Sequence, residues 1–199
     1  MDSGPQWRRF AALSIAAIGA VALAHGTSAA SLKSRSSASD IRLARKVVVP
    51  LRVVNRLFPE ITRQTRTGRN PTATNNPKAT RIVVIYATGD GSKKVTITLD
   101  QYASSNDASS AYEQALQKSQ SVPGFAPVAV SDLGQRAFAG TVTMDAETHV
   151  GLGLLDGRLI VGVTLAGYDA TRDNTAKLVA LARTEAAAAK TALGLSGSQ

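Results

Sequence analysis

The spacing of apolar residues predicts a chain of extended and helical segments. Alternation of apolar and polar residues predicts strands at 81–87 and 94–100, joined by a hairpin turn at 88–92. Three more strands are expected at 136–144, 148–155 and 158–166. Apolar and small residues three and four positions apart predict helices near 49–61, at 104–121 and at 171–193.

The order of these segments, α-β-β-α-β-β-β-α, predicts an α+β fold. We expect an antiparallel sheet of about five strands packed with helices, an α/β sandwich. Residues 31–199 are expected to form one domain, in which a basic N-terminal segment with a helix (31–61) and a polar basic loop (62–80) precede the α+β core (81–199). Asp40 is placed to cap the first helix, and Pro50 interrupts or restarts it.

Residues 1–30 have the pattern of an export signal. Arg8 and Arg9 precede an uncharged apolar run, and small residues follow up to Ala29 and Ala30. The run from Phe10 to Ala24 is shorter than the roughly 20 residues of a membrane-spanning helix, which favours cleavage near Ala29 or Ala30 and a periplasmic or secreted protein. The alternative is an uncleaved anchor in the inner membrane.

Positive charge is concentrated in one segment of the chain. Residues 31–81 contain 12 Lys and Arg against Asp40 and Glu60, whereas the net formal charge of the whole chain is +9. Residues 62–80 contain nothing more apolar than alanine, and a loop of this length is usually functional or disordered. Its basic side chains are candidate ligands for an anionic partner, with an idle, solvated loop as the alternative: Arg63, Arg66, Arg69 and Lys78.

A second candidate site lies on the predicted hairpin at Asp156-Gly157. A two-residue Asp-Gly loop would place Leu155 opposite Arg158 and gather the apolar side chains of both strands on one face. The other face would hold a smooth trough formed by His149, Gly151, Gly153, Gly162 and Thr164. The trough either binds a ligand or receives the last helix, which is rich in small residues at 186–189.

The sequence offers little support for catalysis or cofactors. There is no cysteine, so disulfides, thiolate metal sites and cysteine nucleophiles are excluded, and no phosphate-binding or dinucleotide-binding loop is found. Few aromatic residues and no nucleic-acid motif argue against nucleic-acid binding. We therefore expect no cofactor and no metal. The enzymatic alternative would use His149 with Asp145 and Glu147.

The stretch Asp132–Phe138 (DLGQRAF), followed by two strands joined at Asp156-Gly157 and an alanine-rich helix, resembles a loose bacterial group. Its members are small extracytoplasmic domains of envelope lipoproteins and of some sensor-kinase ectodomains. A tyrosine-flanked stretch, here Tyr102 to Tyr112, also belongs to the pattern, and the likeness covers about residues 45–195. The resemblance implies an α/β sandwich, also seen in photosystem extrinsic subunits, with a binding or sensing role and no catalytic residues. Unlike the lipoproteins, this chain has no cysteine to acylate.

These observations favour an exported, non-enzymatic binding or sensing domain at the bacterial cell envelope. Its ligand would be an anionic envelope component or an envelope protein, bound through the basic loop or the glycine trough. Contact with the membrane would be peripheral unless the N-terminal helix is retained. Two alternatives remain open: a periplasmic enzyme that uses His149, and a membrane-anchored scaffold.

Overall fold

The computed structural model describes residues 47–69, 79–130, 133, 136–144 and 146–195. Within these ranges the chain forms three helices and one antiparallel sheet of seven strands. The helices in this part of the chain are too short or too polar to cross a membrane. The predicted signal peptide and the capping residue Asp40 lie outside the described residues.

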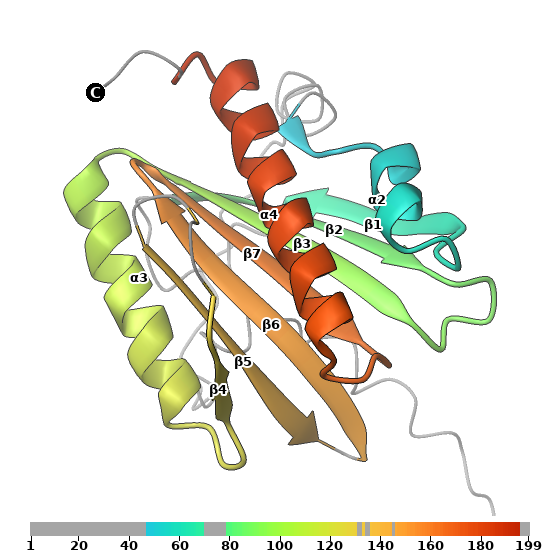
Figure 1. Cartoon of the computed structure of the whole chain (residues 1–199). Coiled ribbons are helices and arrows are strands. Elements are labelled where there is room, and N and C mark those ends of the chain that lie inside the picture. The colour runs from blue at the N-terminus through green and yellow to red at the C-terminus, as the bar shows by residue number, and fades with distance from the viewer. Residues whose placement is uncertain (1–46, 70–78, 131–132, 134–135, 145, 196–199) are drawn as a thin grey trace, which may run out of the picture.

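The α+β class is confirmed, with more strands than the sequence predicts (Figure 1). The strand order across the sheet is β1-β2-β3-β7-β6-β5-β4. In chain order the elements are α2 (Leu51–Leu57), β1 (Arg63–Arg69), β2 (Ala79–Ala87), β3 (Lys94–Tyr102), α3 (Ser105–Gln120), β4 (Ala126–Val128), β5 (Arg136–Met144), β6 (Glu147–Asp156), β7 (Leu159–Ala166) and α4 (Arg172–Ala192).

The starts of the three described helices follow from local sequence, and two of them have a side-chain cap. Helix α2 starts directly after Pro50, whose backbone is extended, so the proline marks a helix boundary as predicted. The side chain of Ser104 accepts a hydrogen bond from the Asp107 amide at the start of α3. Thr171 accepts one from the Asn174 amide at the start of α4 in the same way. These bonds satisfy amides that the first turn of a helix leaves without partners.

One face of the sheet, which we call the core face, holds the main hydrophobic core. Helix α4 runs across this face (Figure 1) and contacts β6 and β7, while α2 packs beside α4. The central strands contribute apolar side chains at every second position, which is the pattern that the sequence predicts. The fully buried members from β6 and β7 are Val150, Leu152, Leu154, Leu159, Val161 and Val163.

The opposite face, which we call the α3 face, has fewer buried apolar side chains than the core face and more polar ones. Helix α3 covers one end of it, where Ala108 and Tyr112 pack against Tyr102 and Leu155. Beside this cluster the three threonines Thr96, Thr98 and Thr164 are buried. The face therefore combines a small apolar cluster with hydroxyl groups.

A buried ion pair joins β2 and β3 on the α3 face. Arg81 and Asp100 lie opposite each other in the two strands. The Arg81 Nε and Nη2 atoms each donate to a different Asp100 carboxylate oxygen at 2.6 Å. This two-point geometry compensates both charges where water has little access.

Two strands were missed by the sequence prediction. Residues 63–69, assigned to the loop 62–80, form the edge strand β1 and pair with β2. The loop prediction is wrong there because no apolar alternation marks a strand whose described side chains, Arg63 to Thr65, are all exposed. The second is β4, three residues long, which contains Pro127 and pairs with β5 at the other edge of the sheet.

The β6–β7 hairpin has a different register from the one predicted. Asp156 pairs with Leu159, so the two-residue loop is Gly157-Arg158 and not Asp156-Gly157. Gly157 has φ +61° and occupies the first central position of the turn, where glycine favours a type II′ geometry. The shift moves each partner by two residues, which leaves every side chain on its predicted face.

The last helix does not pack against the glycine trough. Helix α4 lies on the core face, whereas Gly151, Gly153 and Gly162 occupy alternate positions that belong to the α3 face. The apolar surface of α4 requires the apolar strand residues on the core face, and the trough offers none. The prediction that the small residues at 186–189 pack against the glycine trough is therefore wrong.

Candidate functional site

The basic residues of the predicted loop are only partly brought together. Strand β1 contains Arg63, Arg66 and Arg69, and Lys78 lies outside the described residues. A bulge in β1 shifts the register, so that position 66 is paired with Ile85 and position 69 with Ile82. Ile82 belongs to the main core, and Ile85 belongs to the other face of β2. Positions 66 and 69 are therefore in register with residues on opposite faces.

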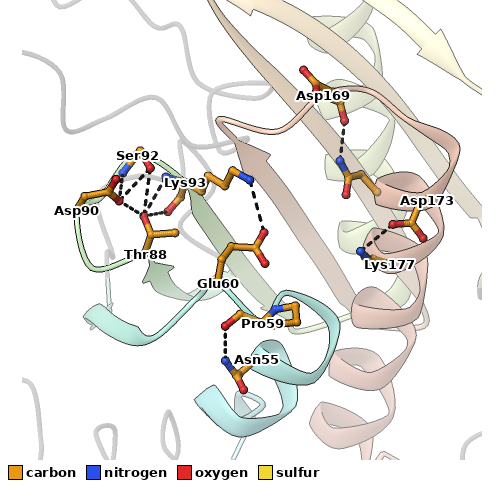
Figure 2. A network of polar contacts seen from close by, with 11 residues as sticks. Asn55, Pro59, Glu60, Thr88, Asp90, Ser92, Lys93, Asp169, Asp173 and Lys177 are labelled. Carbon is orange, nitrogen blue, oxygen red and sulfur yellow. Dashed lines mark hydrogen bonds and ion pairs between the residues drawn. The ribbon is translucent and has the colours of Figure 1, made fainter.

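Arg63 is held against the turn that joins β2 and β3. Its Nε atom donates to the Thr88 carbonyl oxygen at 3.0 Å. The turn itself is tied by Asp90, whose Oδ1 accepts hydrogen bonds from the Thr88 hydroxyl and from the amide and hydroxyl of Ser92 (Figure 2). These donors lower the pKa of Asp90 to about 2. Arg63 thus has a defined position at the end of the sheet.

The register of the sheet places Arg63 in one row with His149. Arg63 pairs with Ala87 and Ala87 with Lys94. Lys94 pairs with Ala166 and Ala166 with His149. Residues paired across strands share a face, so these five positions, which we call the basic row, run across β1, β2, β3, β7 and β6 on the α3 face.

The basic row joins the two candidate sites that the sequence suggested separately. Arg63 comes from the predicted basic loop and His149 from the predicted trough, and Lys94 lies between them. Arg63 and Lys94 are exposed, and the alanines between the ionisable residues are small. Strands lie about 4.8 Å apart, so the backbones of Arg63 and Lys94 are separated by about 10 Å. Lys94 was missed because its neighbours in the row come from distant parts of the sequence.

The next row of the same face continues the trough residues. Position 66 is in register with Ile85, then Thr96, Thr164 and Gly151. Thr96 and Thr164 are paired across β3 and β7, and both are buried. The predicted trough residues Gly151 and Thr164 thus lie one row away from the basic row, on the same face.

The far end of the trough is filled by an aromatic side chain of the protein. A methyl group added at Gly153 would lie 2.6 Å from the Phe138 ring, which is an impossible contact unless the ring moves. Phe138 in turn makes an edge contact with Tyr112 of α3, with ring centres 5.4 Å apart. At Gly162 an added methyl group would meet Thr98 at an ordinary 3.6 Å. Packing therefore accounts for Gly153.

His149 has one acidic neighbour among the described residues. Its Nε2 atom lies 3.8 Å from the Glu147 Oε2 atom, and its side chain is 16% exposed. Asp145, the third residue of the enzymatic hypothesis, lies outside the described residues. Within the part of the chain that the structure describes, no group of three side chains could hold a metal ion. The enzymatic hypothesis therefore remains a prediction without a described catalytic arrangement.

The architecture can be compared with known proteins. The fold is similar to that of the extracellular domain of PknH from Mycobacterium tuberculosis. The two structures align with a TM-score of 0.56 and 11% sequence identity, over 72% of this chain and 96% of that domain. No family model and no curated protein matches the sequence. At this identity the likeness establishes the fold alone, and at that level it supports the predicted resemblance to extracytoplasmic domains.

Proposed function

We propose that the protein is an exported, non-enzymatic sensing domain that binds a polyanionic component of the cell envelope at its basic row. The observation that carries this proposal is the alignment of Arg63, Lys94 and His149 on one sheet face. Export is supported by the predicted leader at residues 1–30 and by the fold shared with an extracellular domain. Cleavage near Ala29 or Ala30 would release the domain from the membrane.

The spacing of the cations favours a polymer over a small anion. An exposed ion pair contributes only about 0–1 kcal/mol, so one such contact gives negligible affinity. The backbones of Arg63 and Lys94 are about 10 Å apart, and the Arg63 Nε atom is already engaged by the Thr88 carbonyl oxygen, so the two cations are presented at separate points of the row. A ligand with repeated negative groups engages both cations at once, and binding then gains from multivalency.

The test compares two double variants that remove the same charge. Arg63→Ala/Lys94→Ala removes the exposed cations of the row, and Arg158→Ala/Arg172→Ala removes two exposed cations elsewhere. The probe is poly(glycerol phosphate), a phosphodiester polymer, with inorganic phosphate as the monovalent comparison. Titration calorimetry at low and moderate salt should show binding weakened by about tenfold in the first double variant and by less than about twofold in the second.

Salt dependence and chain processing complete the test. Binding by exposed cations should weaken as salt rises, and the row variant should lose most of this dependence. Equal losses in the two double variants would show a response to net charge alone, and no loss in the row variant would remove the row as the site.

Export is tested separately by the intact mass of the protein from its own cells, where a chain starting near Ala30 or Ser31 is expected.

A further inference from the structure

Two buried side chains hold the backbone of one residue just before α2. The Val49 amide donates to the Glu185 Oε2 atom of α4 at 2.9 Å. The Val49 carbonyl oxygen accepts a hydrogen bond from the Tyr86 hydroxyl of β2 at 2.5 Å. Residues 47–50, which we call the strap, are thus fixed to both α4 and the sheet through the backbone of Val49.

The Glu185 side chain is out of contact with solvent and only half satisfied. Its residue is 0% exposed, and its Oε1 atom has no hydrogen-bond partner in the described part of the chain. An ionised carboxylate in such a place loses its hydration without full compensation. An apolar residue would fill the same space but would leave the buried Val49 amide without its acceptor, so the bond to Val49 accounts for one carboxyl oxygen and not for the second.

Among the residues that the structure describes, no counter-charge acts on the Glu185 carboxyl group. From the strap, Val47 and Val49 belong to the surrounding hydrophobic core, and α2 contributes Val54. From β2, the ionisable side chain that interacts with it is Tyr86, whose own pKa is raised by burial and by the Glu185 charge. Tyr86 therefore stays neutral over the physiological pH range. The neighbouring apolar residues of α4 itself are Leu178, Leu181, Ala182 and Ala189.

We propose that Glu185 is a proton-binding site that controls the attachment of the strap to the core. With the proton bound, the neutral carboxyl group accepts the Val49 amide bond and remains buried at little cost. Without the proton, the carboxylate draws water toward its second oxygen, and the strap separates from α4. The proposal concerns a different part of the molecule from the basic row and does not depend on it.

The direction of the effect follows from the free energy of burial. Burial raises the pKa of Glu185 from its usual 4.5 to about 7, against a smaller opposing effect of the Val49 amide. The attached strap therefore binds the proton more tightly than the detached strap does. Attachment is strongest below about pH 4.5 and weakens as the pH rises through about 7. For an exported domain this interval includes ordinary changes of external pH.

Attachment and detachment of the strap would also affect the part of the chain that precedes it. The strap connects the core to residues 1–46, which contain the predicted leader. Detachment would release residues 47–50 from α4, so that the attachment of the chain to the core would begin at α2. In a chain that keeps its N-terminal helix, proton binding would thus adjust the link between membrane and domain.

Hydrogen exchange of the Val49 amide, measured by NMR on the full chain from about pH 5 to about pH 9, tests the proposal. After correction for the intrinsic exchange rate, the opening constant of this amide should rise by about 100-fold over that interval. In Glu185→Gln, which retains the carbonyl acceptor and cannot ionise, it should change by less than about threefold. Asp173→Asn, which removes an exposed carboxylate of the same helix, should behave as wild type.

The Glu185 carboxyl carbon provides a second measurement on the unmodified protein. Its chemical shift should titrate near pH 7, and the Val49 amide resonance should follow the same midpoint. This titration decides the matter should Glu185→Gln fail to fold. A midpoint near 4.5, or an opening constant that does not change with pH in the wild type, would overturn the proposal.

Discussion

The two faces of the sheet use the same strands for different purposes. On the core face, β6 and β7 present fully buried Val and Leu side chains to α4. On the α3 face the same strands present His149, glycines and Thr164, and α3 covers one end. Because side chains alternate along a strand, the apolar residues that build the main core lie on one face, and the polar and small residues of the candidate site lie on the other. Three comparisons between variants can test how complete that separation is.

The largest loss of stability is expected on the α3 face, at the buried ion pair. Arg81→Ala leaves Asp100 buried without its partner, and should lower the free energy of unfolding by about 3–5 kcal/mol. Urea denaturation followed by circular dichroism measures it. Replacing both partners, Arg81→Met with Asp100→Leu, should restore most of the loss. A loss below about 1 kcal/mol in Arg81→Ala would show that Asp100 is compensated by other groups.

A smaller loss is expected on the core face. Leu152→Ala removes a fully buried side chain beneath α4 and should cost about 3 kcal/mol, through lost burial and the cavity left behind. Ile85→Ala, at a half-buried position of the α3 face, should cost less than half as much by the same denaturation assay. Equal losses at the two positions would mean that the α3 face is packed as tightly as the core.

The smallest effect is expected where the trough meets its own aromatic ring. Gly153→Ala forces the added methyl group against Phe138 and should lower the free energy of unfolding by about 1–3 kcal/mol. Gly162→Ala, where the methyl group meets Thr98 at an ordinary distance, should stay within about 0.5 kcal/mol of wild type. A lower midpoint of urea denaturation for Gly153→Ala than for Gly162→Ala would show that the trough is filled at Gly153 and has room for a methyl group at Gly162.

The sequence predicted the elements with strong periodicity and missed those without it. Helices α3 and α4 were found because apolar spacing and capping residues agree. Strand β1 was missed because its stability comes from backbone pairing with β2, which no side-chain pattern reports. The predicted faces of the β6–β7 hairpin were correct even though its register was not, because a shift of two residues preserves them.

The candidate site was beyond the reach of sequence patterns. Arg63, Lys94 and His149 share one row only because β7 pairs with β3 on one side and with β6 on the other. Glu185 was equally hidden, since a glutamate within an alanine-rich helix gives no sign that it faces the core. Lys78 and Asp145, both named from the sequence, lie outside the described residues, and their roles stay predictions.

The pairing of β3 with β7 has a consequence for how the chain folds. Strands β2 and β3 form one local hairpin, and β5, β6 and β7 form a local meander. Among the strand pairings of the described residues, the β3–β7 ladder is the one that joins these two blocks, and it links residues near 98 to residues near 162. Contacts between distant parts of a chain form late because they close long loops. We therefore expect the two blocks to behave as separate cooperative units during synthesis, and their union to set the pace of folding.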